Sequence, residues 1–477
     1  MTLDTRIQPL VQPARPLVVC RFVGQLSLVL ALLLAMPTLF ALWSGDRHLA
    51  LALLLTALLP SLLLGMCARL PPSDRPLQAN EALVVTALAF ILAPALLTIP
   101  LASAGLPLLD AWFEAVSGIT TTGLTLVSHP ETASPAFLLT RSWMQWIGGL
   151  GMVVLSLTLA LGRAADMHQL ANAASLEEDP AESVRIHARR VLAVYLVLTA
   201  FGFALVLASG LPAFDAWTHT LSAISTGGFA AFPNNLAGLD RPIEFALLTV
   251  AFLGALPLPL FYRAAVQGAR RFFGDLELRA LATAVTLSAL LLWSLGRIAP
   301  VDAVLQAISA QTGTGFSTLD IGALEPQAKW ILMLSMLTGA GVGSTAGGVK
   351  LLRVLILIRV LQLAILRLQV PRHAVIAPTL GKRDLDSHQI EHALLLLLLF
   401  PLVILLSWLP FLAAGYAPLN SLLDIISATA TVGLSTGITT PALEPGLKVL
   451  LTLDMLAGRV EIIALLVLVY PGTWHKG

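Results

Sequence analysis

The chain has 477 residues, of which 57% are hydrophobic and 12% are charged, and its mean hydropathy is +0.87. A soluble protein of this length carries about twice that share of charged residues. The composition therefore excludes an ordinary soluble domain and indicates a membrane protein surrounded by lipid. The formal net charge is +1 and basic runs are absent, so no nucleic-acid partner is expected.

Apolar stretches of the roughly 20 residues that a helix needs to cross a bilayer occur ten times. They lie near 21–44, 48–67, 82–104, 136–162, 189–210, 242–264, 277–296, 327–364, 390–414 and 444–471, and the eighth and tenth are interrupted. Four shorter apolar segments lie near 110–121, 214–225, 301–312 and 419–430. Each is too short to span, and we expect it to enter and leave from one side while buried within the protein.

The four short segments repeat one pattern. Each follows a proline, and each has an Asp or Asn that can cap a helix start, namely Asp110, Asp215, Asp302 and Asn420. A glycine-bearing loop follows 12 or 13 residues later, and one long span lies on either side. The pattern predicts an all-α membrane protein with four tandem units of span, reentrant pore helix, filter loop and span around one pore. The expected boundaries are 1–78 for two leading spans, then 79–165, 186–270, 275–368 and 388–477 for the units.

The basic residues predict the orientation of the spans, because cytoplasmic loops are richer in Lys and Arg. With the N-terminus inside, 20 of the 28 lysines and arginines fall on inside segments and six on outside segments. This bias predicts that both termini are cytoplasmic and that the short helices enter from the outer side. The mixed-charge inside loops near 163–190 and 365–390 are either solvated linkers or docking surfaces for a soluble partner.

The four loops are the candidate ion site. The C-terminal end of a short helix is the negative end of its dipole, and glycine permits the backbone angles that turn carbonyl groups toward one axis. Potassium filters with the sequence Thr-Val-Gly-Tyr-Gly use such carbonyl rings. None of the loops contains Asp or Glu, which favours a monovalent cation. Thr/Gly clusters also occur where membrane helices pack closely, but four in register favour a filter. The candidate filter residues are Thr121, Thr122, Gly123, Ser225, Thr226, Gly227, Gly313, Thr314, Gly315, Thr431, Val432 and Gly433.

The eighth stretch contains five glycines between positions 339 and 348. In a continuous helix they would cost about 1 kcal/mol each, so two half-helices with a loop between them are expected. A phosphate-binding loop is excluded because the Gly-Lys-Ser/Thr ending is absent. The loop is a candidate gate on the inner side of the filter, with Lys350 either reaching the inner interface or holding the loop. The candidate gate residues are Gly339, Gly341, Gly343, Gly347, Gly348, Lys350 and Arg459.

Arg459 lies within the tenth stretch, and an arginine in the membrane usually lines a cavity or pairs. It is a gate element if it faces the axis. Its partner is either Glu461 or a group on another helix. Glu114 and His219, in the first two short helices, are expected to pack or form hydrogen bonds and not to bind a ligand.

These motifs resemble the TrkH/TrkG/KtrB/HKT superfamily of potassium transporters, most closely its TrkH branch. The matching stretches begin at Phe113, Arg141, Gly343 and Gly458 and end at Gly123, Gly151, Lys350 and Glu461. The resemblance implies potassium uptake across a bacterial inner membrane by a homodimer, with a soluble, nucleotide-binding subunit of the TrkA type on the cytoplasmic face. It also implies filter glycines at Gly123, Gly227, Gly315 and Gly433, a gating loop at 339–348 and a gate arginine at Arg459.

The leading hypothesis is a gated potassium permeation protein, which is not an enzyme and binds no cofactor beyond the potassium that it transports. Proton- or sodium-coupled symport is the alternative, although the sequence offers few ionisable groups near the membrane midplane for coupling. A membrane anchor with vestigial pores is disfavoured by the four intact loops.

Overall fold

The computed structural model describes residues 13–71, 77–171, 180–369, 371, 378–381 and 383–475. In these residues the chain is almost wholly helical, and strands β1 (Thr379–Leu380) and β2 (Arg383–Asp384) form one antiparallel hairpin. Six described helices are long and apolar enough to cross a membrane, or seven if a bent pair counts as one span. The prediction of an all-α membrane protein is confirmed. Much of the two mixed-charge inside loops falls outside the described residues.

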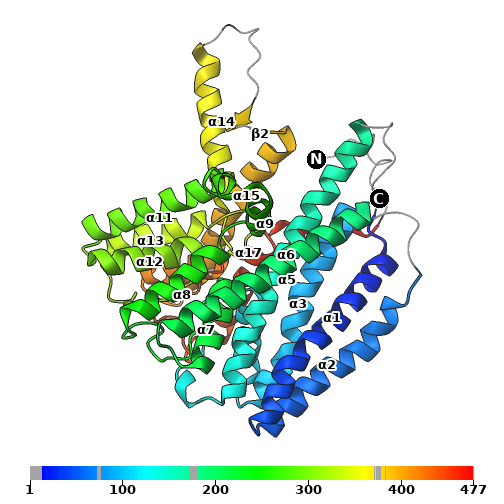
Figure 1. Cartoon of the computed structure of the whole chain (residues 1–477), viewed down its shortest axis with the longest axis vertical. Coiled ribbons are helices and arrows are strands. Elements are labelled where there is room, and N and C mark those ends of the chain that lie inside the picture. The colour runs from blue at the N-terminus through cyan, green and yellow to red at the C-terminus, as the bar shows by residue number, and fades with distance from the viewer. Residues whose placement is uncertain are drawn as a thin grey trace.

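Two helices lead the chain, as predicted. α1 (Pro16–Trp43) and α2 (Arg47–Ala68) pack on one another along one flank of the molecule (Figure 1). Asp46 caps α2 by accepting a hydrogen bond from the Leu49 N–H at 3.2 Å. Arg15, just before α1, binds the buried Glu81 of α3 with an Nε–Oε1 distance of 2.6 Å. This ion pair ties the hairpin to the rest of the chain.

The remaining helices follow in four groups. The first contains α3 (Ala79–Ser103), α4 (Leu108–Ile119) and α5 (Pro135–Ala171), with the 3₁₀ turn η2 (Pro130–Thr132). The second contains α6 (Pro180–Ala208), α7 (Ala213–Ile224), α8 (Arg241–Gly254), α9 (Leu258–Gln267) and α10 (Ala269–Phe273). The third contains α11 (Leu276–Ser294), α12 (Pro300–Thr312), α13 (Pro326–Thr338) and α14 (Leu351–Gln369). The fourth contains α15 (Ser387–Ala413), α16 (Pro418–Thr429), α17 (Pro445–Arg459), α18 (Ile463–Val469) and η3 (Pro471–Thr473).

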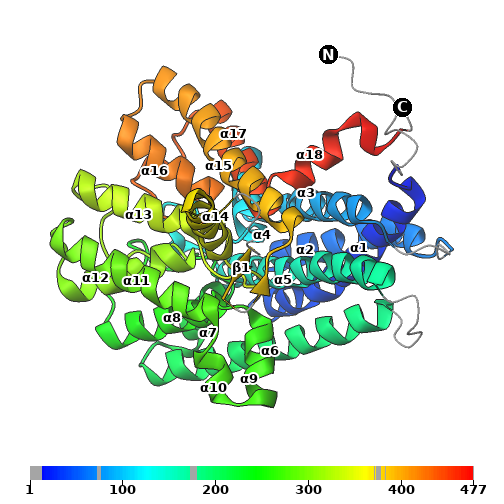
Figure 2. The ribbon, with the colours of Figure 1, turned by 90° about the horizontal axis from the view of Figure 1, so that it is seen from above.

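The four groups follow one another in a closed circuit. The helix that leaves each short helix also contacts the short helix of the next group: α5 contacts α7, α8 contacts α12, and α13 contacts α16. The last of these contacts, between α17 and α4, returns to the first group. Figure 2 shows the groups arranged around the body, with α1 and α2 outside them. The division of the chain at the residue boundaries expected above stays a prediction.

Three apolar stretches are broken in the structure. α13 ends at Thr338 and α14 begins at Leu351, as the five glycines indicated. α17 ends at Arg459 and α18 begins at Ile463, which is the interruption expected in the tenth stretch. The continuous sixth span expected over 242–264 was wrong, because α8 and α9 meet at an angle of 85°. Pro257 and Pro259 lie at this bend, where they cannot donate the N–H that a continuous helix requires.

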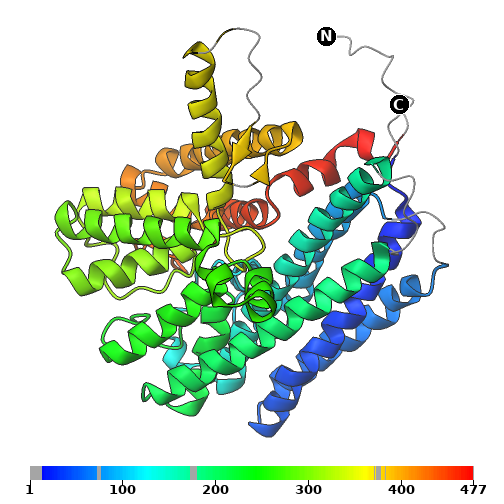
Figure 3. The ribbon, with the colours of Figure 1, turned by 45° about the horizontal axis from the view of Figure 1, so that its top comes forward.

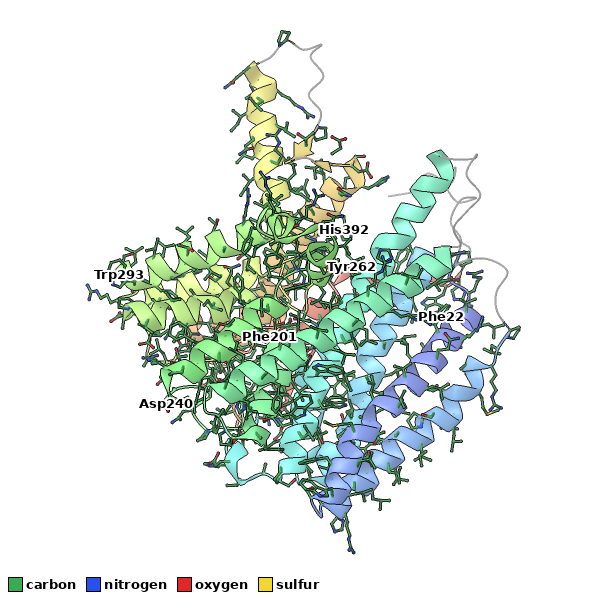
Figure 4. All side chains as sticks on the ribbon, viewed as in Figure 1. Phe22, Phe201, Asp240, Tyr262, Trp293 and His392 are labelled. Carbon is green, nitrogen blue, oxygen red and sulfur yellow. The ribbon has the colours of Figure 1, made fainter. Side chains whose placement is uncertain are left out.

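Large apolar side chains cover the outer flanks of the body. Phe201 of α6 and Trp293 of α11 are about half exposed, at 52% and 54% (Figure 4). Such surfaces are typical of helices that face lipid. α14 projects from the body beside the β hairpin, as Figure 3 shows, and its Leu361 and Leu368 are also exposed.

Candidate functional site

The four short helices, α4, α7, α12 and α16, begin in the same way. A proline precedes the first helical residue or occupies it, at Pro107, Pro212, Pro300 and Pro418. A proline costs little there because the first N–H groups of a helix have no internal partner. Each helix then has its Asp or Asn at the third helical position. The expectation that these residues cap the helices was wrong, because none of the four helices has a side-chain cap hydrogen bond.

Three of these four polar residues bind a cation from the preceding group instead. The pairs are Lys448 Nζ with Asp110 Oδ1 at 2.5 Å, Arg241 NH1 with Asp302 Oδ1 at 2.6 Å, and Lys329 Nζ with Asn420 Oδ1 at 2.9 Å. The Lys448–Asp110 pair joins the fourth group to the first. Asp215 has no such ion pair among the described residues. The starts of the short helices are therefore clamped at three of the four junctions.

The backbone leaves each short helix along one path. The first residue with a positive φ is Thr121, Thr226, Gly313 or Thr431. The next N–H donates to the carbonyl of a serine in the helix, in the pairs Thr122–Ser117, Gly227–Ser222, Thr314–Ser309 and Val432–Ser427. The residue after that is a glycine with positive φ, namely Gly123, Gly228, Gly315 or Gly433. This register places every such glycine 13 residues after the Asp or Asn.

The second loop differs from expectation by one residue. The sequence gave the set Ser225, Thr226 and Gly227, whereas Thr226, Gly227 and Gly228 occupy the positions of Thr121, Thr122 and Gly123. Ser225 is the last residue of its helix and its hydroxyl donates to the Leu221 carbonyl at 2.8 Å. Two adjacent glycines hid the register, and only the uniform spacing of 13 residues could have revealed it.

The four glycines form a closed ring of contacts. A side-chain Cβ built on Gly123 would lie 2.1 Å from the carbonyl oxygen of Gly227, and one on Gly228 would lie 2.0 Å from that of Thr314. The same construction on Gly315 meets the Val432 oxygen at 1.9 Å, and on Gly433 it meets the Thr122 oxygen at 2.3 Å. Each loop thus packs against a carbonyl of the next, and the fourth returns to the first. Glycine is required at these positions by both the φ angle and the close approach.

A buried polar side chain holds the outer part of each loop, and the sequence revealed this only in part. Glu114, His219, Gln306 and Asp424 each lie four residues after the Asp or Asn. Each accepts a hydrogen bond from the backbone N–H 12 residues further along, at Leu126, Ala231, Thr318 and Thr436. The expected hydrogen-bonding role of Glu114 and His219 is confirmed. Gln306 and Asp424 were missed, although the repeated spacing marks them.

The loop between α13 and α14, residues 339–350, lies against the ends of the short helices. The Thr345 hydroxyl donates to the Ile224 carbonyl at 3.1 Å and the Gly254 carbonyl at 3.0 Å. A Cβ on Gly347 would lie 1.9 Å from the Thr431 Oγ1, so this glycine permits close contact with the fourth loop. Positive φ angles occur at Gly339, Gly343 and Gly348, whereas Gly341 packs against Pro257. The loop is therefore seated directly beneath the ring.

The two basic residues of the membrane interior bind backbone carbonyls. Arg459 donates from NH1 to the Thr345 carbonyl at 2.8 Å and from NH2 to the Gly148 carbonyl at 3.0 Å, so it joins the 339–350 loop to α5. Glu461 does not pair with it but forms an ion pair with Arg353 of α14 at 2.6 Å. Lys350 is buried and donates to the Ala346 carbonyl. Of the two roles considered for Lys350, holding the loop is the one observed.

Comparisons with known proteins agree with this geometry. The profile of the TrkH family, described as "Cation transport protein", matches residues 60–472. An uncharacterized cation transporter of Methanocaldococcus jannaschii is 30% identical over 87% of this chain and 88% of its own length. The Trk system potassium uptake protein TrkH of Escherichia coli K12 is 28% identical over 78% of this chain and 81% of its own. The crystal structure of the potassium transporter TrkH from Vibrio parahaemolyticus, 23% identical, aligns over 96% of this chain and 99% of that one with a TM-score of 0.82. The chain belongs to the TrkH family of cation transport proteins.

Proposed function

We propose that this protein takes up potassium across a membrane through a filter formed by the carbonyl groups of Thr122, Gly227, Thr314 and Val432. The closed ring of glycine–carbonyl contacts is the observation that carries the proposal, because it brings four equivalent carbonyls around one axis. Such a ring can replace the hydration shell of a monovalent cation. Relatives named as potassium uptake proteins of the Trk system support potassium as that cation.

Threonine hydroxyls add oxygen atoms at the inner end of the filter. The Oγ1 atoms of Thr121 and Thr431 are buried and have no hydrogen-bond partner among the described residues. Buried hydroxyls normally find a partner, so the two free hydroxyls fit a site that an ion occupies. Gly313 has no side chain at the equivalent position, and the Thr226 hydroxyl donates to its neighbour Ser225.

The filter is tested by a Gly315→Ser variant reconstituted in liposomes. The added side chain would meet the Val432 carbonyl at 1.9 Å and displace it, so the potassium-over-sodium flux ratio should fall at least about tenfold, equivalent to about 1.4 kcal/mol. Gly446→Ser, where a Cβ meets open space, is the matched control and should keep the ratio. An unchanged ratio in Gly315→Ser, with rubidium as the potassium tracer, would overturn the filter assignment.

The 339–350 loop and Arg459 form the gate in this proposal. Opening requires the loop to leave the ends of the short helices, and Arg459 resists that movement through its bond to the Thr345 carbonyl. Arg459→Ala should therefore raise basal rubidium flux severalfold, by removing hydrogen bonds that each contribute about 1.5–3 kcal/mol. Arg297→Ala, outside the gate, serves as control. Equal or lower flux in Arg459→Ala at normal expression would contradict the gate role.

The assembly proposed is a homodimer in a bacterial inner membrane, with a soluble nucleotide-binding subunit of the TrkA type on its cytoplasmic face. The exposed apolar residues of the projecting α14 suit a contact with a second copy. The two ends of the described chain lie together, since the Ala14 N–H donates to the Thr473 carbonyl at 2.7 Å. This is consistent with both termini being cytoplasmic. Cross-linking through a cysteine placed at Leu361 would test the dimer, and protease access to the termini in sealed vesicles would test the orientation.

Proton- or sodium-coupled symport is the second candidate, and Asp454 of α17 is the observation that favours it. Its carboxyl group is buried; Oδ1 accepts a hydrogen bond from Ser407 at 2.6 Å, and Oδ2 has no partner among the described residues. Buried ionisable groups in transporters often carry coupling protons. If uptake is coupled to protons at this site, an Asp454→Asn variant should lose the pH dependence of rubidium uptake. Flux that is independent of pH in both proteins would exclude proton coupling at Asp454.

A further inference from the structure

One side chain outside the four loops reaches a carbonyl of the ring. Gln145 of α5 is fully buried, and its Nε2 donates to the Gly227 carbonyl at 2.5 Å. Its Oε1 accepts from the Ser222 hydroxyl at 2.7 Å and from the Phe229 N–H at 3.2 Å. A residue of the first group thus binds the second loop on both sides of Gly228.

The orientation of the Gln145 amide follows from the chemistry of its partners. The Phe229 N–H can only donate, and the Gly227 carbonyl can only accept. The amide oxygen must therefore face Phe229 and the amide nitrogen must face Gly227. Turning the amide over would oppose two donors and two acceptors, so this contact holds the carbonyl in one position.

The other three loops lack this support. In the fourth loop, the Ser427 hydroxyl accepts from the Gly433 N–H at 3.0 Å; in the third, the Ser309 hydroxyl donates to the Phe316 carbonyl; and in the first, the Ser117 hydroxyl has no described partner. Gly148, Gly254 and Gly458 each pack against the last carbonyls of a short helix in their own group. The residue three positions before each of these glycines is Gln145, Ala251 or Met455. Only the first of these three side chains can donate a hydrogen bond.

We propose that Gln145 is a specificity-determining residue of the filter, because it positions the Gly227 carbonyl and occupies part of its hydrogen-bonding capacity. One of the four carbonyls is then held by a side chain from a neighbouring group, and the ring has one position whose distance from the ion is set from outside. This inference rests on the proposed filter. It adds that the preference among monovalent cations depends on α5 as well as on the loops.

A Gln145→Met variant tests this, because methionine has a similar length and cannot bond to Gly227. Purified protein in liposomes should still conduct rubidium. The rubidium-to-sodium flux ratio should change by about threefold to tenfold relative to the unmodified chain, as expected for the loss of one hydrogen bond. Met455→Leu is the matched control at the corresponding position of the fourth group, where a volume-conserving change should leave the ratio unaltered. Ser222→Ala removes one bond to the amide and should shift the ratio in the same direction by less.

The outcomes separate this inference from the proposed function. If the unmodified chain prefers rubidium and both Gln145→Met and Ser222→Ala keep that ratio, the role of Gln145 is overturned and the filter stands. If the unmodified chain conducts no cation, both proposals fall. If Gln145→Met does not fold, by melting temperature and size-exclusion profile, the ratio measured for Ser222→Ala decides. A lower melting temperature with an unchanged ratio shows a structural role alone and overturns the inference.

Discussion

The first and fourth loops meet the same requirement with different chemistry. In the first, Glu114 binds the loop and also forms a buried ion pair with Arg141, with an NH2–Oε2 distance of 3.1 Å. In the fourth, Asp424 has no cation partner among the described residues and instead accepts five hydrogen bonds, from Ser435, Thr436 and Thr439. Both carboxyl groups are fully buried. The loop geometry is thus common to the two groups, whereas the means of stabilising the buried carboxyl group differs.

This difference matters because the two sites should respond unequally to loss of charge. A buried charge that loses its partner is costly, while a hydrogen-bonded carboxylate can be replaced by a neutral acceptor at a smaller cost. The arginine in the first group also lies 4.0 Å from the centre of the Phe229 ring, so it cannot turn to solvent without leaving that contact.

Glu114→Gln should have the largest effect. It leaves the guanidinium of Arg141, 2% exposed, without its anion, and should destabilise the protein by about 3–5 kcal/mol. The melting temperature in detergent measures this. The double variant Glu114→Gln/Arg141→Met should recover part of the loss because no unpaired charge remains. A single variant as stable as the unmodified chain would show that the ion pair contributes little.

Asp424→Asn should have an intermediate effect of about 2–3 kcal/mol. The new amide nitrogen would face one or more of the donors that the carboxylate accepts, but no buried cation is left behind. The same melting experiment applies, and Asp320→Asn, on an exposed turn, is a control for the chemical change. A loss larger than that of Glu114→Gln would reverse the comparison between the two loops.

Gln306→Met should have the smallest effect, below about 1 kcal/mol. The Gln306 Oε1 accepts one long hydrogen bond, from the Thr318 N–H at 3.4 Å, and Nε2 has no described partner. Thermal unfolding should barely change. A large destabilisation would mean that the third loop depends on its glutamine as strongly as the first depends on its glutamate.

Much of the fold could be predicted because its signals are local. Proline, Asp or Asn, and glycine recur around each short helix, and the helices begin and end within two residues of the expected segments. The break after Thr338 followed from the glycines alone. The bend between α8 and α9 was missed because the apolar run continues through it, although Pro257 and Pro259 mark the position.

The site was less accessible from the sequence because its contacts join distant residues. The adjacent glycines 227 and 228 allow two registers, and only the contact with Thr314 distinguishes them. Arg353, the partner of Glu461, lies 108 residues away, and that of Asp110 is 338 residues away. Spacing along one helix cannot identify such pairs. The role of Gln145 was likewise hidden, because an isolated glutamine in an apolar helix carries no periodic signal.

The contact between Gly433 and the Thr122 carbonyl has a consequence for synthesis of the protein. The ring closes only when the last loop reaches the first, so every shorter nascent chain has an open ring. At a translation rate of about 5–20 residues per second, the first loop waits for tens of seconds. During that interval Asp110 also lacks Lys448, the partner that it has in the finished chain. A truncated product therefore leaves a defective pore element in the membrane, which a quality-control protease can distinguish from the complete protein.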